Sequence, residues 1–363
     1  MTGSSACDLV NYLISLQLNI VVVTLKSNYG GGGNPKSCDG QTVYRLSGIY
    51  NGKNKYFRLF SSIIENWILV RKALSLKPRL IISLTDPPLL NFWVSYFSKK
   101  RRIYWVYWAM DLYPEAFIAA NLVSRNNFIY RIINSNLKKN RPYGLISLGP
   151  NQQFYLEDYF GKIDNKVVLH CGIQKNITET TILPFWKCNF KLVIGYVGNI
   201  GEAHDERFVM SIIDSIDPEK QHFILSVYGS KSKCLIDYAI GKPGVDIVSS
   251  IPAEELTCID IHVVSLLKLW DHVCVPSKAF TAVSLGCPLL LNCSKKSDVY
   301  GCLIDASWHF DIYNQNTLKS FFSGITSKDI ITKRNAAFNI SKNLVSFNDS
   351  SLKDIYNLLE KCD

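Results

Sequence analysis

This 363-residue sequence lacks several features that define common protein classes. No uncharged apolar run reaches the ~18–20 residues that a membrane-spanning helix requires. The eleven cysteines include no Cys-x-x-Cys pair and the six histidines are isolated, which argues against a disulfide framework and a structural metal. Residues 1–16 contain no basic segment, so a signal peptide is not expected. The scattered cysteines indicate reduced thiols and predict a cytoplasmic protein.

Acidic residues are scarce in the amino-terminal half. Residues 1–170 contain 21 Lys and Arg against 9 Asp and Glu, whereas residues 171–363 contain 19 against 21. A half with this excess of cations predicts an anionic partner, which is a membrane surface, a polyanion or a phosphorylated substrate. No recognised nucleic-acid-binding module is present, so nucleic acid is not an expected partner.

Apolar runs of strand length alternate with segments of helical periodicity along the whole chain. Strands that are apolar throughout indicate parallel sheets covered on both faces, so we expect an α/β fold. The pattern pauses over residues 171–190, which predicts two Rossmann-like domains facing a cleft. Ligands of such sheets bind outside the carboxyl ends of the strands. The predicted strands are 19–25, 43–47, 80–85, 103–110, 144–148, 166–170, 191–197, 222–228, 245–249, 260–266 and 288–292, and a last helix is predicted over 349–361.

The rest of the sequence is organised around residues 191–205, KLVIGYVGNIGEAHD. An apolar strand is followed by a turn of Gly198, Asn199, Ile200 and Gly201, and then by an amphipathic helix that ends near residue 216. Glycine lets backbone N–H groups approach a ligand, and a helix start favours anions. A diphosphate suits this turn, but a packing turn without a ligand suits it equally well.

A second informative block contains Pro276, Ser277 and Lys278, which open a helix that closes at Gly286. Proline is a good first-turn residue. A lysine in the first turn opposes the helix dipole unless an anion is bound there. The sequence therefore favours phosphate binding by Ser277 and Lys278 over two ordinary surface residues.

Five motifs occur in an order and spacing that resemble a known enzyme family. They are TDPP at 85–88, WAMDLYPE at 108–115, GYVGNIGEAHD at 195–205, HVVSL at 262–266, and VPSK at 275–278 with GCP at 286–288. Together they resemble family-4-type bacterial glycosyltransferases of the GT-B fold, in the branch that builds capsule, exopolysaccharide and O-antigen.

This resemblance implies transfer of a sugar from a UDP- or GDP-linked donor to a saccharide acceptor that is lipid-linked, with retention of configuration and without a metal or other cofactor. Peptide dipoles and lysines then stabilise the leaving diphosphate. Residues 1–170 would bind the acceptor, 171–190 would be a linker, 191–345 would bind the donor, and a helix over 346–363 would pack back on the first domain. The implied donor-binding residues are Gly198, Asn199, Ile200, Gly201, Lys231, Ser277 and Lys278, with Ile251 beside the nucleobase.

Asp111 is the candidate catalytic residue. It lies at the end of predicted strand 103–110, where a carboxylate could accept the proton of an attacking hydroxyl group. It could instead be the N-cap of a helix over 112–119.

Four consecutive cations, Lys99, Lys100, Arg101 and Arg102, are predicted to lie between an aromatic helix over 89–97 and the next strand. Beside aromatic residues they suit an anionic leaflet, which predicts a peripheral protein that meets its acceptor on the cytoplasmic face of the inner membrane. A solvated loop is the alternative.

The sequence departs from the family in three places. Val273 and Thr281 occupy the positions of the two glutamates of the family's Glu-x7-Glu motif, although Asp271 lies close by. Glu202 stands where relatives often have a cation, and the first strand of the amino-terminal sheet is expected to be missing. These departures favour a rival hypothesis, a catalytically degenerate GT-B protein that binds a membrane or a partner. A nucleotide-sugar epimerase is a second rival.

Overall fold

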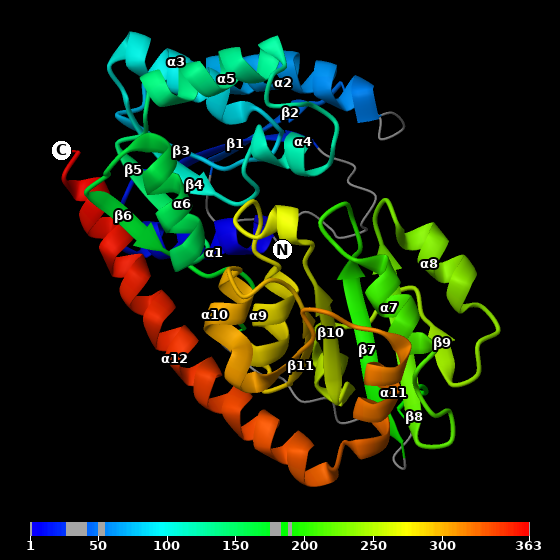
Figure 1. Cartoon of the computed structure of the whole chain (residues 1–363). Helices are drawn as coiled ribbons and strands as arrows, with labels where there is room; N and C mark the ends of the chain where they lie inside the picture. The colour runs from blue at the N-terminus through cyan, green and yellow to red at the C-terminus, as the bar shows by residue number, and fades with distance from the viewer. Residues whose placement is uncertain (1, 27–41, 50–54, 175–182, 188–190, 363) are drawn as a thin grey trace. The chain divides into compact units, whose positions relative to one another are not determined.

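The computed structural model describes residues 2–26, 42–49, 55–174, 183–187 and 191–362 (Figure 1). The chain divides into two compact units. Unit 1 comprises Met1–Cys171, His272–Cys274 and Asn348–Asp363, and unit 2 comprises Gly172–Asp271 and Val275–Phe347. The Gly-rich loop near residue 30 lies outside the described residues.

Unit 1 contains two parallel sheets. Within the described residues, β1 pairs only with β2, and the second sheet has the order β3-β4-β5-β6. The central strand β4 is buried from Trp105 to Ala109, as its unbroken apolar sequence predicts. The elements are α1 (Thr2–Ser15), β1 (Val21–Lys26), β2 (Thr42–Ser47), α2 (Lys55–Ser75), β3 (Leu80–Ser83), α3 (Leu90–Arg101), β4 (Tyr104–Ala109), α4 (Glu115–Ala119), α5 (Phe128–Lys139), β5 (Gly144–Ser147), α6 (Pro150–Phe160) and β6 (Asn165–Val168).

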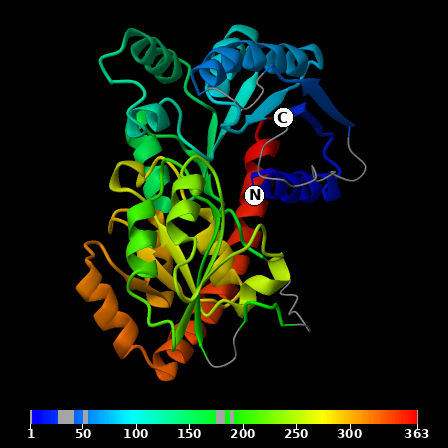
Figure 2. The ribbon, with the colours of Figure 1, turned by 90° about the vertical axis from the view of Figure 1, so that its right-hand side faces the viewer.

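Helices α2, α3 and α5 form one layer of unit 1 (Figures 1 and 2). The side-chain amide of Asn136 on α5 donates hydrogen bonds to Phe92 O and Ser95 Oγ on α3, at 3.1 and 2.8 Å. These partly buried polar contacts hold the two helices side by side. Helix α6 contacts α5 as well, since the hydroxyl of Tyr159 donates to Asn134 and Lys138 lies 4.9 Å from the centroid of the Tyr159 ring.

Unit 2 is a single parallel sheet in the order β12-β11-β10-β7-β8-β9. The chain moves outward from β7 in both directions, so β7 and β10 flank a topological switch point. One face carries a core around Tyr196, Phe208 and Phe223, each fully buried. The elements are β7 (Leu192–Asn199), α7 (Glu206–Ile213), β8 (Gln221–Tyr228), α8 (Ser232–Ala239), β9 (Val245–Ile247), η1 (Ala253–Cys258), β10 (Ile261–Ser265), η2 (Lys268–Trp270), α9 (Ser277–Ser284), β11 (Leu289–Asn292), α10 (Asp298–Leu303), η3 (Ile304–Ala306), β12 (Ser307–His309) and α11 (Gln315–Gly324).

The last helix is much longer than the sequence predicted. Helix α12 (Ser327–Glu360) has 34 residues and begins 22 residues before the predicted start. Polar residues occupy buried positions on it and hide the apolar periodicity. Ser341 donates a hydrogen bond to Ser284 O at 2.9 Å within unit 2, and Asn348 is paired with the backbone of His170 within unit 1. Hydrogen-bonded polar residues of this kind are tolerated in a core.

Helix α9 ends where its glycine predicted. Gly286 has a φ of 76°, and the amides of Gly286 and Cys287 donate to Val283 O and Ala282 O, both at 2.9 Å. This double hydrogen bond is the Schellman arrangement, which favours glycine at the left-handed position. A Cβ on Gly286 would also lie 2.5 Å from the ring of Phe338.

The substitution Gly286→Ala is therefore expected to lower the free energy of unfolding by about 1–2 kcal/mol, because alanine must adopt the left-handed conformation. Urea unfolding followed by tryptophan fluorescence measures the change. Gly324→Ala is the matched control, since Gly324 is an exposed helical residue whose added Cβ meets no described atom within 4 Å. Equal destabilisation by both substitutions would contradict the prediction.

Candidate functional site

The candidate donor site of unit 2 lies where β7 and β8 end. The amide of Ile200 donates to Tyr228 O at 2.8 Å, and the amide of Lys231 donates to Ile200 O at 3.1 Å. A Cβ on Gly229 would lie 2.1 Å from Asn199 Oδ1, so only glycine lets the two loops approach this closely. The loops after β7 and β8 therefore form one rigid edge.

The predicted turn over 198–201 needs correction. Strand β7 continues through Gly198 and Asn199, because its pairing with β8 extends to Asn199 and Tyr228. The side chain of Ile200 is fully buried in the core, and its amide is already hydrogen-bonded to Tyr228 O. Neither the side chain nor the amide is therefore available to a ligand. What the strand end does offer is room, since a Cβ on Gly198 would meet no described atom within 4 Å.

Lys278 extends from the first turn of α9 to the end of β7. Its ammonium group donates to Asn199 O at 3.1 Å and to the hydroxyl of Tyr196, and it lies 3.8 Å from the centroid of the Tyr196 ring. A cation over an aromatic face is attracted by the ring. The positive charge therefore lies beside the open Gly198, and Ser277 is the first residue of the helix that carries it.

Lys231 is already paired within unit 2. Its ammonium group donates to Glu206 Oε2 and to His204 O, both at 2.6 Å. Burial tends to raise the pKa of Glu206, but the hydrogen bond from Lys231, a backbone hydrogen bond and the charges of Lys231 and Arg207 together hold that pKa below its ordinary value. A bound anion would have to share Lys231 with the Glu206 carboxylate. The spacing of residues in the sequence did not reveal that Glu206 pairs with Lys231.

His204 lies beneath this edge and is 8% exposed. Its Nδ1 is 2.7 Å from Ser265 O, which places the proton on Nδ1. Burial, followed by the charge of Lys278, holds the pKa of His204 well below its ordinary value. The imidazole is therefore neutral and adds no charge to the site.

The three residues that depart from the family pattern, Glu202, Val273 and Thr281, are either buried or hydrogen-bonded within unit 2 or to its neighbouring segment. The hydroxyl of Thr281 donates to Gly172 O at 2.8 Å and also lies 3.1 Å from Ser277 O, and Val273 is 2% exposed. Glu202 accepts a hydrogen bond from Ser230 Oγ at 3.0 Å. Ile251 follows β9 and packs against the core cluster that contains Val193 and Ile259.

Asp111 lies two residues after the end of β4 in unit 1 and is exposed. Its amide donates to Thr85 Oγ1 at 3.0 Å, which ties the ends of β3 and β4 together. The N-cap interpretation is wrong, because α4 begins only at Glu115 and its N-cap is Pro114.

Glu115 was missed as a candidate. It is 8% exposed, and within the described residues its Oε1 has no hydrogen-bond partner. Burial raises the pKa of Glu115 above its ordinary value.

The four cations at 99–102 are not in a loop. Lys99, Lys100 and Arg101 form the last turn of α3, and Arg102 is its C-cap. Cations stabilise the negative end of the helix dipole, so the helix extends further than its aromatic residues indicated. Arg102 precedes β4 and Asp111 follows it, so the two lie at opposite ends of a strand of about 20 Å.

No group of three or more His, Cys, Asp or Glu side chains in the described part of the chain is placed to hold a metal ion. Among the same residues, no helix is both long enough and apolar enough to cross a membrane.

No protein-family model matches the sequence, and no curated protein matches it. Solved structures do resemble it. Sucrose-phosphate synthase from Thermosynechococcus elongatus is 13% identical over 98% of this chain and 91% of its own, with a TM-score of 0.71. WaaG, a glycosyltransferase involved in lipopolysaccharide biosynthesis, is 12% identical over 95% and 93%, with a TM-score of 0.67. An E. coli trehalose-6-phosphate structure bound with UDP-2-fluoro glucose is 13% identical over 98% and 95%, with a TM-score of 0.67.

These neighbours are GT-B glycosyltransferases, and the predicted GT-B fold with two Rossmann-like units is confirmed. At these identities the likeness establishes the fold and nothing more specific.

The buried His204 predicts a pH dependence of stability. Unfolded histidine has a pKa of about 6.5, whereas folded His204 resists protonation, so stability falls as the pH decreases below about 6.5. We expect the unfolding free energy of a His204→Asn variant to depend less steeply on pH between 7 and 5, by up to about 1.4 kcal/mol per pH unit. Urea titrations at several pH values test this. Equal slopes in both proteins would contradict it, because His170 and His262 contribute equally to each.

Proposed function

We propose that this protein is a glycosyltransferase that moves a sugar from a nucleotide-sugar donor to a saccharide acceptor in surface polysaccharide biosynthesis. The observation that supports it best is the lysine beside an open glycine at the end of β7, next to the switch point of a parallel sheet. Sugar nucleotides carry their negative charge on a diphosphate, and this arrangement suits that group.

In this proposal unit 2 binds the donor. Lys278 neutralises the diphosphate as the bond to the sugar breaks, and Lys231 adds a second cation once it is shared with Glu206. These fixed charges act where charge develops in the transition state, so we expect a metal-independent reaction. The nucleobase lies toward Ile251, beyond β8, and a UDP-linked donor is favoured by the UDP-sugar analogue bound in the E. coli neighbour.

Unit 1 binds the acceptor in this proposal, and Asp111 accepts the proton of the attacking hydroxyl group. An exposed carboxylate at the carboxyl end of β4 is accessible to an acceptor, and its backbone is fixed through Thr85. We expect the transfer to retain the configuration of the donor sugar, as the resemblance to family-4-type enzymes implies.

The outer surface of α3 and α5 supports attachment to an anionic membrane. The two helices carry Lys99, Lys100, Arg101, Arg131, Lys138 and Lys139 and no acidic residue. Three apolar side chains of α5 are exposed, namely Phe128 at 74%, Ile129 at 60% and Ile132 at 44%. Cations beside exposed apolar side chains suit the interface of an anionic bilayer.

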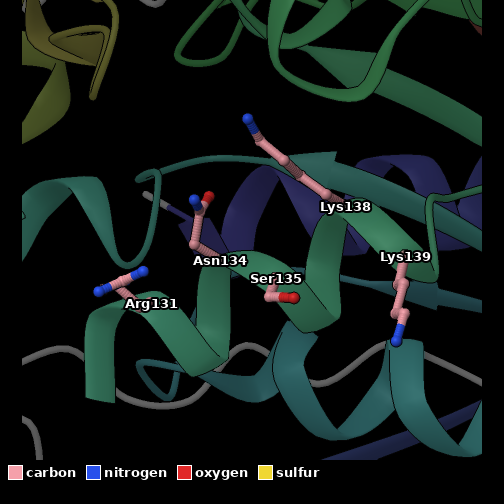
Figure 3. A pocket seen from close by; sticks show the side chains of 5 residues that line it. All are labelled: Arg131, Asn134, Ser135, Lys138 and Lys139. Carbon is pink, nitrogen blue, oxygen red and sulfur yellow. The ribbon is translucent and has the colours of Figure 1, made fainter. Parts of the chain in front are cut away.

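A surface hollow of about 460 Å³ on α5 belongs to the same face. Arg131, Asn134, Ser135, Lys138 and Lys139 line it, and Figure 3 shows Lys138 and Lys139 leaving the helix in different directions. Three cations without a counter-ion in its lining suit lipid phosphates. We therefore propose a peripheral protein on the cytoplasmic face of the inner membrane, with a lipid-linked acceptor.

One observation favours the degenerate alternative. Lys231 is neutralised by Glu206, and neither Val273 nor Thr281 supplies a carboxylate. A protein of that kind would bind a membrane or a partner but no nucleotide. An epimerase would instead release an altered sugar or free nucleotide from the donor alone.

The donor proposal is tested at Lys278. We expect Lys278→Ala to weaken nucleoside diphosphate binding by roughly 10- to 100-fold, because hydrogen bonds to charged groups contribute about 1.5–3 kcal/mol. Calorimetry with UDP and GDP measures the loss, and Lys233→Ala, an exposed lysine of α8, is the control. Unchanged affinity in the Lys278 variant would remove this lysine from the site.

The membrane proposal is tested by replacing residues 99–102 with serine. Each basic residue near an anionic surface contributes about 1 kcal/mol, so binding is expected to fall by up to roughly 1,000-fold. Co-sedimentation with phosphatidylglycerol-containing vesicles measures it, and phosphatidylcholine vesicles show the neutral background. The control replaces four exposed lysines of unit 2, Lys233, Lys319, Lys328 and Lys342. Equal loss in both variants would indicate net charge rather than this surface.

A further inference from the structure

A second hollow of unit 1 lies at the amino edge of its four-stranded sheet. It has a volume of about 500 Å³ and is formed where the chain passes from α3 to β4, from α5 to β5 and from α6 to β6. These three helix ends meet at one edge because the strands are parallel. Asp111 lies beyond the opposite end of β4, so this amino-edge hollow is separate from the candidate catalytic residue.

The lining of the amino-edge hollow is strongly cationic. Among the described residues that form it, four are basic and one is acidic, namely Lys99, Lys139, Arg141, Lys162 and Asp164. Lys139 also lines the hollow on α5, and Figure 3 shows its side chain leaving the helix away from Lys138. Cations gathered in a concave surface raise the local concentration of anions, so an anionic ligand is expected here.

The helix dipoles explain half of these cations. Lys99 and Lys139 lie in the last turns of α3 and α5, where a positive charge is stabilising, and Lys99 Nζ donates to Lys139 O at 3.3 Å. Arg141 and Lys162 lie beyond the helix ends, in the loops before β5 and β6. Lys162 is 3.4 Å from Asp164, but both side chains are 84% exposed, and such pairs contribute little. A bound anion accounts for Arg141 and Lys162 better than either effect.

The hollow also contains polar groups that suit hydroxyls. Ser98 lines it and is 3% exposed, and its Oγ has no hydrogen-bond partner in the part of the chain that the structure describes. Buried hydroxyls are rarely left in this state. Asn140 Nδ2 donates to Asn136 Oδ1 at 2.9 Å, and Asn165 Nδ2 donates to Tyr143 O at 3.4 Å. The side-chain oxygens of Asn140 and Asn165, together with the carbonyl groups at the helix ends, are acceptors for a ligand that carries hydroxyls.

An aromatic pair completes the lining. The rings of Tyr104 and Tyr143 lie 4.8 Å apart between their centroids, and Tyr104 is 45% exposed. An exposed ring of this kind has an apolar body and a polar tip, so it offers a surface to the carbon atoms of a ligand whose polar groups are bound elsewhere.

We propose that the amino-edge hollow binds a polyol phosphate, which is a phosphate group esterified to glycerol or to a sugar. The phosphate accepts hydrogen bonds from Arg141 and Lys162, and the hydroxyls donate to the acceptors at the helix ends. Polyol phosphates occur free and as headgroups of anionic lipids. The assignment does not require the donor site of unit 2. With a lipid as the source, it deepens the proposed membrane attachment and rests on it.

Calorimetry on the full chain tests the chemistry of the ligand. The chain carries Lys278→Ala, so that the candidate donor site contributes little, and the probes are glycerol 1-phosphate, glucose 6-phosphate, inorganic phosphate and glucose. We expect one of the two polyol phosphates to bind more tightly than inorganic phosphate or glucose. Replacing Arg141 and Lys162 with glutamine should weaken that binding by roughly 10- to 100-fold.

Two further variants separate binding from folding and from net charge. The matched control replaces Arg45 and Lys353, exposed cations of unit 1 outside the hollow, with glutamine and should stay within two-fold. Asp164→Asn removes the acidic residue of the lining and should tighten binding by up to about five-fold. A folding defect cannot produce that gain.

Vesicles identify the source of the phosphate. Co-sedimentation with phosphatidylglycerol vesicles, against phosphatidylcholine vesicles, compares the Arg141 and Lys162 double variant with its control. Weaker binding by the double variant assigns the hollow to a lipid headgroup, and equal binding assigns it to a free polyol phosphate if the calorimetric loss is observed. If wild-type protein binds the soluble probes but no vesicle, the membrane proposal fails and this assignment stands.

Two results would overturn the assignment. If the double variant matches its control with every soluble probe and with vesicles, the hollow is not a binding site. If inorganic phosphate binds as tightly as both polyol phosphates and the vesicles do not distinguish the variants, the hollow holds a bare anion and the role of the hydroxyl acceptors is wrong.

Discussion

The parallel pairing of β7 with β8 and β10 is the constraint on which the rest of unit 2 depends. Tyr196 and Ile194 bury the middle of β7, and the paired backbone carries the strand as far as Asn199. The strand ends there, at an open edge, because the next residue, Ile200, turns into the core. Lys278 and the loop that carries Lys231 are both positioned against this strand end. The chemistry of the candidate site thus follows from where one buried strand stops.

The charges at this edge are balanced rather than merely positive. Lys231 is neutralised by Glu206, His204 is kept neutral by burial, and Lys278 rests on an aromatic ring and a carbonyl oxygen. Such contacts hold two cations ready without leaving a buried charge uncompensated. In the proposed function, an incoming diphosphate would share Lys231 with Glu206.

In unit 1, the candidate catalytic residue and the candidate membrane-binding cations lie at opposite ends of the parallel strand β4. Asp111 lies at the carboxyl end of β4, whereas the cations of α3 lie near its amino end, because a helix that connects parallel strands runs antiparallel to them. The cationic segment 99–102 therefore lies at the opposite end of β4 from Asp111.

The sequence by itself determined the fold class and most of the strands, because buried parallel strands are apolar throughout, and it determined the end of α9, because Gly286 takes a conformation that other residues avoid. It did not determine the start of α12, where buried Ser341 and Asn348 interrupt the apolar pattern, nor the three-residue strand β12, which is too short to show a period. Only the tertiary structure decided what the polar side chains do. Lys278 meets Asn199 across 79 residues, and Ser294 meets Asp271 across 23. Such partners are joined by the folding of the sheet and not by spacing along the chain, so the pairing of Lys231 with Glu206 could not be inferred before the strands were in place.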